Sequence, residues 1–350
     1  MTQENTKQIP DALVRISEWH AASRRLLPWR QDPTPYHTWI AEIMLQQTRI
    51  EAVIPYYGRF LDELPDIPAL AAVPEDRLLK LWEGLGYYSR ARNLKKAAVL
   101  LTEQYGGALP ASFSELRKLP GIGDYTAGAI ASIAFGLPEP AVDGNVMRVM
   151  ARLMARPDDI LKPRVRQEFT GLLRAFYPSG RNAGLLTEGI MELGETVCLP
   201  NTAPRCESCP LNGICLAHLA HNELSYPVRS APASRRIEQK TVFLLRCGDR
   251  YAIRKREGHG LLAGLWEFPN VEGSLSEAEA VRQISAWGLQ AEDTTPCGTA
   301  KHIFTHVEWR MTGYLIRCPE QVPLFLWCLP DEIEDCYSLP TAFRFYRKLL

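Results

Sequence analysis

The chain has 350 residues, of which 46% are hydrophobic and 23% are charged, so it is long enough to bury more than one apolar core. Its 40 basic and 40 acidic side chains give a formal net charge of zero, which argues against a protein that holds a polyanion through a uniformly basic surface. No stretch has the length and apolarity of a membrane span, and the first residues lack an export signal, so we expect a cytoplasmic protein.

Residues 1–220 form the first predicted domain. Between residues 9 and 219, apolar side chains recur every three or four positions, as at Val146, Val149 and Leu153. This period is typical of amphipathic helices, and strand-like alternation is scarce. The first domain is therefore predicted to be mainly helical.

Two acidic residues of this domain occupy predicted positions that suit acid–base chemistry. Glu42 lies in a helix that begins near Pro35, among apolar neighbours such as Trp39, where burial would favour the protonated carboxyl. Asp143 stands directly before the helix through Val146, where the positive end of the helix dipole would keep its carboxylate charged. The alternatives are a solvated helix acid for Glu42 and a simple N-cap for Asp143.

A glycine-containing loop separates two predicted helices at residues 119–128, with the sequence LPGIGDYTAG. Gly121 and Gly123 can adopt backbone angles closed to other residues and leave no side chain in the way, so a polyanion could approach the amides that begin the second helix. This pattern predicts a helix-hairpin-helix phosphate clamp, which would let a neutral protein hold DNA through a few oriented amides. The alternative is a plain turn between two packed helices.

Four of the nine cysteines are close together in the sequence CLPNTAPRCESCPLNGIC. Four thiolates at this density would repel one another unless a cation held them, so the cluster predicts a metal centre. Zinc and a 4Fe–4S cluster both accept four thiolates, and the presence of a single CxxC pair favours the iron–sulfur cluster. Four unrelated buried thiols are the alternative. The candidate ligands are Cys198, Cys206, Cys209 and Cys215.

Residues 221–238 are rich in proline, serine and arginine and predict a linker. Residues 239–350 form the second predicted domain, of the α+β class. Within it, two strand-like runs flank a Gly-Asp turn at residues 241–256, and another strand is expected near Val307. A helix should begin after Ser276, because Glu279 completes a capping box with it.

Three of these motifs together resemble the endonuclease III superfamily of DNA glycosylases: the LPGIG loop, the cysteine cluster and the segment PAVDGNVMRV at residues 140–149. Within that superfamily, AEIMLQQTR at residues 41–49, GLGYYSRARNL at 84–94 and the second domain are similar to the MutY-type adenine glycosylases, which remove adenine mispaired with 8-oxoguanine. The resemblance implies a mainly α helix-hairpin-helix glycosylase domain with an iron–sulfur cluster loop, followed by a Nudix-like domain. It also implies a monomer that binds double-stranded DNA with an A:8-oxoguanine or A:G mispair, on the nucleoid if the protein is bacterial.

The resemblance implies roles for three residues in the reaction. Glu42 would protonate adenine at N7 and later help to activate water, and Asp143 would stabilise the sugar cation. Tyr125 matches the position of the lysine that forms a Schiff base in the lyases of the superfamily. Because a phenol cannot form a Schiff base, Tyr125 implies a glycosylase without lyase activity and would assist the two acids.

Further residues match positions that contact the substrate or the DNA in the family. Trp29, Arg30 and Glu188 match residues around the adenine pocket. Gln47, followed by Thr48 and Arg49, and Tyr87, followed by Tyr88, match the side chains that wedge the duplex while the adenine is flipped out. Gly121 and Gly123 would hold a backbone phosphate, and the loop of Phe304, Thr305 and His306 would contact 8-oxoguanine. Arg90 and Arg92, in a stretch expected to be a loop, are further candidates for phosphate contacts.

The sequence departs from the family pattern at three places. The helix expected to hold magnesium in a Nudix hydrolase has Val281, Arg282, Ser285 and Ala286 where an arginine and three glutamates belong, which argues against hydrolysis by the second domain. Thr305 replaces a serine, which retains a hydroxyl but adds a methyl group. One extra residue separates the first two cysteines, and a loop can accommodate it as a bulge.

Three other functions remain open at this point. The first is a bifunctional pyrimidine-damage glycosylase-lyase, which Tyr125 opposes. The second is a nucleotide pyrophosphohydrolase with a DNA-binding module, which the missing glutamates oppose. The third is a protein that binds lesions without cutting, because every candidate residue could serve binding alone.

Overall fold

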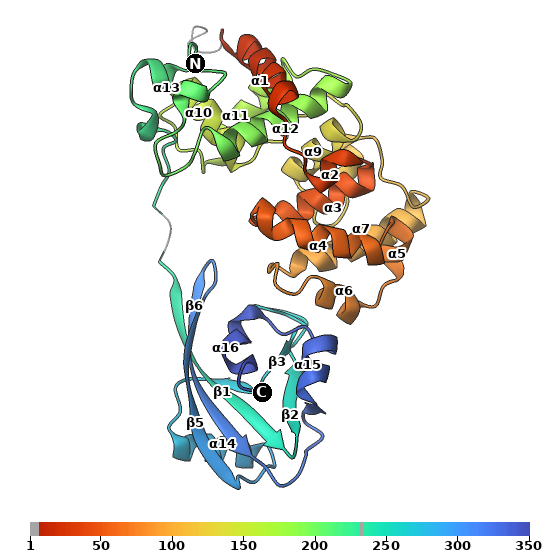
Figure 1. The fold of residues 1–350 in the computed structure, drawn as a ribbon, viewed down its shortest axis with the longest axis vertical. Coiled ribbons are helices and arrows are strands. Elements are labelled where there is room, and N and C mark those ends of the chain that lie inside the picture. The colour runs from red at the N-terminus through yellow and green to blue at the C-terminus, as the bar shows by residue number, and fades with distance from the viewer. Residues whose placement is uncertain (1–6, 232–233) are drawn as a thin grey trace. The chain divides into compact units, whose positions relative to one another are not determined.

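The computed structural model describes residues 7–231 and 234–350. The chain divides into two compact units, one of residues 1–72 and 93–231 and the other of residues 73–92 and 232–350 (Figure 1). Residues 1–6 of the first predicted domain and residues 232–233 of the predicted linker lie outside the described residues. The boundaries expected at residues 220 and 239 stay a prediction.

The first unit is helical, as predicted. Its helices are α1 (Ile9–Ser23), α2 (Pro28–Gln31), α3 (Pro35–Leu45), α4 (Ile50–Glu63), α5 (Ile67–Ala72), α8 (Phe113–Leu116), α9 (Asp124–Ile133), α10 (Gly144–Leu153), α11 (Pro163–Arg174), α12 (Arg181–Thr196) and α13 (Leu216–Leu219). Helix α7 (Ser89–Gln104) runs across the boundary between the two units. Arg90 and Arg92 therefore lie on a helix and not in the expected loop, because the turn at residues 84–88 ends one residue before α7 begins.

Helix α12 is the element around which the first unit packs, since it contacts α1, α9 and α10. Helix α3 contacts α9 in turn, so α3, α9, α10 and α12 meet although they come from distant parts of the sequence. The backbone of α9 lies very close to the segment around Pro140. Gly128 of α9 makes this possible, because an added Cβ there would lie 2.4 Å from the carbonyl oxygen of Pro140. The segment after Pro140 leads directly to Asp143, so this packing fixes the start of α10 against α9.

Two local signals place the ends of the helices that matter for function. The side chain of Thr34 accepts a hydrogen bond from the His37 amide at 3.1 Å and caps α3, whose first residue is Pro35, as predicted. Asp143 caps α10, with Oδ1 accepting hydrogen bonds from the amides of Asn145 and Val146. Asp143 is therefore an N-cap in geometry, as the simpler alternative proposed.

The second unit contains a mixed sheet with the strand order β3-β2-β1-β6-β5, while β4 pairs with β1 and β7 with β2. The strands are β1 (Arg236–Cys247), β2 (Arg250–Lys255), β3 (Trp266–Glu267), β4 (Asn270–Glu272), β5 (Asp293–Ile303), β6 (Val307–Arg317) and β7 (Leu326–Cys328). Strands β1 and β6 are parallel and in register from Arg236 with Val307 to Arg246 with Arg317, and the other pairs are antiparallel. The predicted hairpin is confirmed as β1 and β2.

Helices cover both faces of this sheet. On one face, α14 (Glu277–Ala286) packs Ala280 and Ile284 against Phe243 and Leu245 of β1. The alternate residues Val242 and Leu244 belong to the core on the other face, which also includes side chains from α15 (Pro330–Cys336) and α16 (Arg344–Arg347). The capping box of Ser276 and Glu279 is present at the start of α14, as predicted. The unit is completed by α6 (Glu75–Leu81), and every helix within residues 7–231 and 234–350 is too short or too polar to cross a bilayer.

Candidate active site

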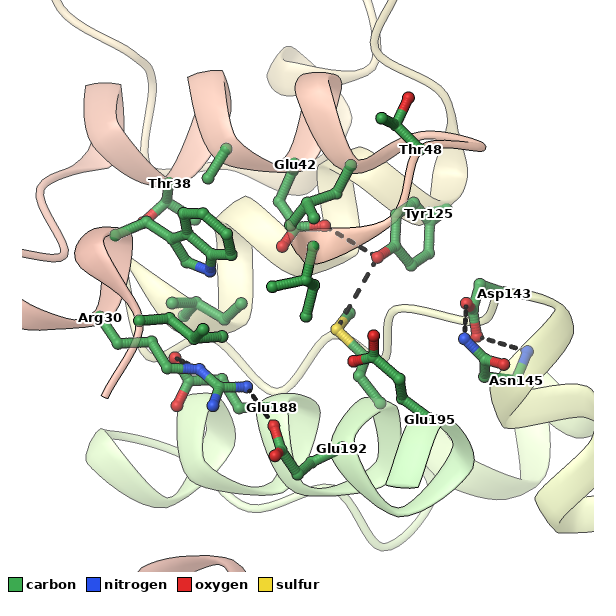
Figure 2. Close-up of a pocket in the computed structure, with 17 residues that line it drawn as sticks. Arg30, Thr38, Glu42, Thr48, Tyr125, Asp143, Asn145, Glu188, Glu192 and Glu195 are labelled. Carbon is green, nitrogen blue, oxygen red and sulfur yellow. Dashed lines mark hydrogen bonds and ion pairs between the residues drawn. The ribbon is translucent and has the colours of Figure 1, made fainter. Parts of the chain in front are cut away.

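A cavity of about 150 Å³ in the first unit brings together all six of the predicted catalytic and adenine-pocket residues (Figure 2). Its walls come from α2, α3, α9, α12 and the start of α10. Glu42 and Asp143 are separated by a hundred residues of sequence, yet both line this cavity. The predicted residues that line it are Trp29, Arg30, Glu42, Thr48, Tyr125, Asp143 and Glu188.

Glu42 projects from the buried side of α3 and is 6% exposed. Its Oε2 accepts a hydrogen bond of 2.8 Å from the Tyr125 hydroxyl. Burial raises the pKa of Glu42 to about 7, with Asp143 and Glu188 adding to the rise and the Tyr125 hydrogen bond and Arg30 opposing it. The carboxyl is thus half protonated near neutral pH, in the direction expected from its apolar setting.

Asp143 presents a carboxylate whose oxygens are held by donors at the start of α10. Oδ1 accepts from the amides of Asn145 at 2.9 Å and Val146 at 2.8 Å, and Oδ2 accepts from the Asn145 side chain at 3.1 Å. Burial raises the pKa of Asp143 even so, against the lowering effect of these donors and of Arg148. The helix start therefore offsets part of the desolvation cost and does not by itself bring the pKa below the ordinary aspartate value.

The α12 wall of the cavity carries carboxylates that are matched by cations. Glu188 pairs with Arg24 at 2.9 Å and His20 at 3.2 Å, and Arg30 donates to Glu192 at 2.9 Å. Burial would raise the pKa of Glu188, but the hydrogen bond from His20 and the charges of Arg30 and Arg24 outweigh it and lower that pKa. This side of the cavity holds fixed negative charges, each with a positive neighbour.

Tyr125 joins the two sides of the cavity. Its hydroxyl donates to Glu42 and lies 3.7 Å from the sulfur of Met191 on α12. Burial and the neighbouring carboxyls Glu42 and Asp143 raise the pKa of Tyr125 well above its usual value. The phenol is therefore neutral at physiological pH and acts as a hydrogen-bond donor.

Sequence reasoning missed several cavity residues on α12 and at the start of α10. Met191, Glu192 and Glu195 line the cavity from the same helix as Glu188, and Asn145 holds Asp143. The spacing of Glu188, Met191, Glu192 and Glu195 follows one helical face, which was a signal that the sequence carried. It could not be interpreted without knowing that this face turns inward.

The helix-hairpin-helix loop lies between α8 and α9. Gly121 has a φ of +78°, and an added Cβ would lie 2.7 Å from Cβ of Asn93, so glycine is required there for both reasons. Gly123 differs from the prediction, since its φ of −89° is open to any residue. The space beside its Cα is empty, however, which leaves the amides at the start of α9 accessible.

The two residues expected to wedge the duplex share an unusual backbone conformation. Gln47 has a φ of 57° and Tyr87 a φ of 48°, in the left-handed region that disfavours side chains other than glycine, asparagine and aspartate. Gln47 is exposed in the turn after α3, beside Thr48 and the exposed Arg49, and Tyr87 is 47% exposed in the second unit, before the buried Tyr88. Both side chains are held on strained turns, which sequence reasoning did not anticipate.

The arginines after Tyr88 have internal partners. Arg90 is 8% exposed, and its guanidinium donates to the carbonyl oxygens of Leu85 and Gly86. Arg92 pairs with Glu75 at 2.9 Å. These contacts brace the turn before α7, so neither guanidinium is presented freely to a phosphate.

The expected lesion-reading loop is the turn between β5 and β6. Phe304 packs its ring against Trp309 at 4.9 Å, while Thr305 and His306 are exposed. Within the second unit, the Thr305 hydroxyl lies 2.9 Å from the Tyr87 hydroxyl. The Thr305 hydroxyl, which a serine would also have, is therefore in hydrogen-bond distance of Tyr87.

The four clustered cysteines lie in the loop after α12 and at the start of α13. The thiols of Cys206, Cys209, Cys215 and Cys198 are close enough to influence one another electrostatically, and burial raises the pKa of Cys206 and of Cys209 to about 12. Burial disfavours the thiolates of Cys206, Cys209 and Cys215, so the convergence of the four cysteines fits a site where a bound metal stabilises thiolates. Arg152 supports this reading, since its Nη1 donates to the Cys198 sulfur at 3.2 Å.

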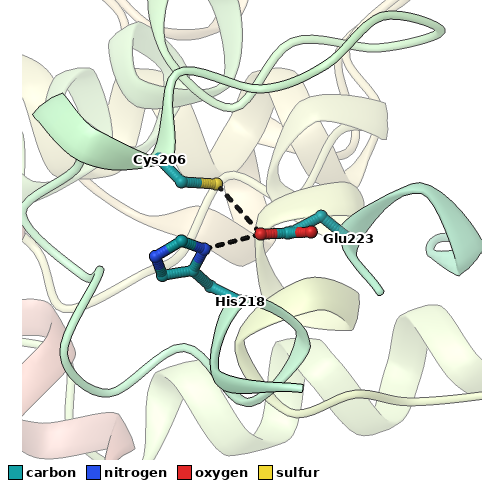
Figure 3. A group of neighbouring side chains, drawn as sticks. All are labelled: Cys206, His218 and Glu223. Atoms are coloured by element: carbon teal, nitrogen blue, oxygen red, sulfur yellow. Dashed lines mark hydrogen bonds and ion pairs between the residues drawn. The ribbon is translucent and has the colours of Figure 1, made fainter. Parts of the chain in front are cut away.

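A histidine and a glutamate lie beside Cys206, as Figure 3 shows. The Glu223 carboxylate lies 2.6 Å from His218 Nδ1 and 3.6 Å from the Cys206 sulfur. The Cys206 thiol donates to the same Glu223 oxygen that meets His218, so the three side chains form one hydrogen-bonded group. His218 and Glu223 add a polar edge to the predicted metal site that the sequence pattern did not indicate.

A buried arginine connects the cysteine loop to the cavity. Arg148 on α10 donates to the Cys198 carbonyl at 2.7 Å and to the Asn145 side chain at 2.9 Å, and Asn145 in turn donates to Asp143. Gly194 of α12 leaves space for the Asn145 side chain, because an added Cβ at residue 194 would lie 2.7 Å from Cβ of Asn145. A chain of hydrogen bonds therefore connects the cysteine loop with Asp143.

Both parts of the chain are similar to known proteins. Residues 40–175 match the HhH-GPD superfamily of base excision DNA repair proteins, and residues 241–348 match the NUDIX domain. The adenine DNA glycosylase of Buchnera aphidicola subsp. Schizaphis graminum is 34% identical over 77% of this chain and 77% of that protein, and that of Homo sapiens is 32% identical over 95% of this chain and 73% of that protein. A trapped endonuclease III–DNA covalent intermediate is similar in fold, with a TM-score of 0.53 and 28% identity over 62% of this chain and 98% of that chain.

Proposed function

The chain belongs to the adenine DNA glycosylases, and we propose that it removes adenine paired with 8-oxoguanine or guanine in double-stranded DNA. The observation that carries this proposal is the cavity in which Glu42, with its pKa raised to about 7, lies with Asp143. Cleavage of a glycosidic bond needs a proton donor and a negative charge beside the sugar, and two carboxyl groups in one cavity can divide these tasks. The small volume, about 150 Å³, suits a single base rather than a whole nucleotide.

The proposed reaction breaks the bond between adenine N9 and C1′ of the deoxyribose. The electron pair of that bond moves into the base as Glu42 donates its proton to N7. The carboxylate of Asp143 stabilises the positive charge that develops on the sugar. Water then adds to C1′ and gives its proton to the Glu42 carboxylate, which restores the starting state of the site.

The remaining residues of the cavity would position the base and the acid. Tyr125 holds Glu42 through its hydrogen bond, and Arg30 and Glu188 present a fixed polar edge opposite it. Trp29, 8% exposed, provides an apolar surface beside them. A neutral phenol at residue 125 cannot form a Schiff base with the sugar, which supports a glycosylase without lyase activity.

Outside the cavity, the proposed DNA contacts are distributed over both units. The amides after Gly121 and Gly123 would bind a backbone phosphate of the duplex, and Gln47 and Tyr87 would fill the space that the flipped adenine leaves. Thr305, between Phe304 and His306, would contact the base opposite adenine. We expect a monomer that acts in the cytoplasm, on the nucleoid if the source is bacterial.

We further propose that Cys198, Cys206, Cys209 and Cys215 hold a 4Fe–4S cluster. When bound, it would tie the loop after α12 into one conformation through four iron–sulfur bonds. Arg148 and Asn145 would transmit that order to Asp143 through the hydrogen bonds described above. Protein purified without oxygen should contain iron and absorb broadly in the blue part of the visible spectrum; zinc without iron would contradict this assignment.

The decisive experiment is adenine release under single-turnover conditions from duplexes with adenine opposite 8-oxoguanine, guanine, cytosine or thymine. We expect fastest release opposite 8-oxoguanine, slower release opposite guanine, and little opposite cytosine or thymine. Equal rates for all four duplexes would contradict the proposed substrate. Borohydride trapping of a covalent DNA adduct would instead favour the bifunctional lyase.

A further inference from the structure

Thr38 is a polar residue of the Glu42 cavity to which the proposed reaction gives no task. It lies on α3 one helical turn before Glu42, and both residues line the cavity (Figure 2). Residues four positions apart on a helix lie on the same face, which explains why one cavity receives both side chains. Thr38 is therefore a neighbour of the group that would protonate the base.

The Thr38 hydroxyl is buried without a hydrogen-bond partner. The residue is 5% exposed, and its Oγ1 makes no hydrogen bond within residues 7–231 and 234–350. A threonine on a helix can donate to the carbonyl four residues earlier, as Thr170 of α11 does to Arg166 at 2.8 Å, but Thr38 makes no such bond to Thr34. Because a buried hydroxyl without a partner costs stability, its presence in the cavity points to a ligand that supplies the partner.

The order of the polar groups along the cavity gives the direction in which a bound adenine would lie. In the proposed reaction, Asp143 faces C1′ of the sugar and Glu42 faces N7 of the base. Figure 2 shows Thr38 on the other side of Glu42 from Asp143. In adenine, N7 comes between the glycosidic nitrogen N9 and the exocyclic amino group along one edge of the base. The amino group would therefore extend past Glu42 toward Thr38.

We propose that the Thr38 hydroxyl oxygen accepts a hydrogen bond from the exocyclic amino group of the flipped adenine. This inference rests on the proposed function and adds to it a residue that recognises the base. The amino group has two N–H donors, so it can donate to Thr38 on the α3 wall and to Glu188 on the α12 wall. A purine without the amino group leaves the hydroxyl unpaired, so the site favours adenine over that purine.

Thr38 serves substrate recognition at a cost to the free protein. Thr38→Val keeps the branched shape of the side chain and removes the unpaired hydroxyl, so the melting temperature should stay the same or rise. Thr170→Val removes a hydroxyl that already has a backbone partner, so it should not raise the melting temperature. A variant that is at least as stable as the native protein but less active would indicate a substrate contact and not a structural one.

The test compares two duplexes that carry either adenine or unsubstituted purine opposite 8-oxoguanine. Base release is measured with the full-length protein under single-turnover conditions. Thr38→Val should slow adenine release by about three- to tenfold, the value of one hydrogen bond, and leave purine release unchanged or faster. Thr38→Ser keeps the hydroxyl and should keep the native ratio of the two rates. Thr170→Val, the same substitution on a distant helix, is the control and should change neither rate.

The native protein separates failure of this inference from failure of the proposed function. If the native protein releases no adenine opposite 8-oxoguanine, both are overturned. If it releases adenine, but Thr38→Val slows both substrates by the same factor or slows neither, the role of Thr38 is overturned and the proposed function stands. Equal slowing would indicate a distorted cavity, because only a contact with the amino group changes the ratio of the two rates.

Discussion

Glu42 and Glu188 face the same cavity and are equally buried, each 6% exposed, yet their pKa values shift in opposite directions. Glu42 has a phenol as its hydrogen-bond partner and negative neighbours in Asp143 and Glu188. Glu188 has His20, Arg24 and Arg30 around it. Burial alone therefore does not decide which carboxyl carries a proton; the charges supplied by the surrounding helices do.

The two carboxyl groups are therefore suited to different tasks within one cavity. A carboxyl that titrates near neutral pH can give and take a proton during a reaction, whereas an ion-paired carboxylate holds its charge and its position. The Glu42 and Asp143 side of the cavity is thus suited to the reaction, and the α12 side to placing the base. The following experiments break or sharpen that distinction.

The largest effect is expected where the reacting groups are removed. Glu42→Gln and Asp143→Asn should each slow single-turnover adenine release by about 10²–10⁴-fold, because the first removes the proton donor and the second the negative charge. Binding of the mispaired duplex, measured by fluorescence anisotropy, should be retained. Glu51→Gln, at an exposed position of α4, is the control. A near-normal release rate in either variant would remove that residue from its proposed role.

Substitutions on the α12 side of the cavity should change the free energy of unfolding more than the rate of adenine release. Arg30→Gln leaves Glu188 and Glu192 less compensated and should lower the free energy of unfolding by about 3 kcal/mol at pH 7. Because the pKa of Glu188 is lowered in the native protein, its contribution to stability is present above the ordinary glutamate pKa and is lost as the pH falls through the lowered value. The difference between the variant and the native protein should therefore shrink as the pH falls from neutral.

Urea unfolding at several pH values measures this difference. Arg166→Gln, at an exposed position of α11, should be nearly neutral. Adding Glu188→Gln to Arg30→Gln should recover part of the lost stability, since it removes a buried carboxylate that has lost one of its cations. A stability loss that does not depend on pH would argue that Arg30 acts by packing and not by charge.

Tyr125 should set the pH at which Glu42 works. In the native protein, release should fall as the pH rises through about 7, because Glu42 then loses the proton it must donate. The Tyr125 hydrogen bond lowers the pKa of Glu42, so Tyr125→Phe should move this limb of the pH–rate profile to higher pH. A limb that moves to lower pH, or that stays in place, would show that the phenol does not stabilise the charged form of Glu42.

The smallest effect separates the two functions of Asp143. Asparagine caps a helix about as well as aspartate, so Asp143→Asn should leave the melting temperature nearly unchanged while adenine release is lost. Asp143→Ala removes both the charge and the cap of α10, and should cost about 1 kcal/mol of stability in addition. Equal stability in the two variants would show that the cap contributes little here.

Much of the fold was predictable because its signals are local. Pro35 after Thr34, Asp143 before an amphipathic run and the capping box at Ser276 mark helix starts through contacts within a few residues. Gly121 was predictable for the same reason, since a turn between two helices required its backbone angle. The cavity was predictable only as a list of candidates, through resemblance to a family.

Residues whose role depends on distant neighbours escaped the sequence. Asn145 gave no sign that it faces the cavity, and the helical spacing of Glu192 did not show which way its face turns. Arg90 was expected in a loop, although it lies on α7 and its guanidinium donates to the carbonyl of Leu85. These roles depend on contacts between segments that lie far apart in the sequence, and the order of residues does not contain those contacts.

The sequence by itself determined where α3, α10 and α14 begin, which residue caps α10, and that a phenol rather than an amine stands at position 125. Only the tertiary structure decided that Glu42 holds its proton near neutral pH while Glu188 does not. The reason is physical: helix starts and side-chain identities are local, whereas the pKa of a buried acid depends on the water it has lost and on charges that distant segments bring to it.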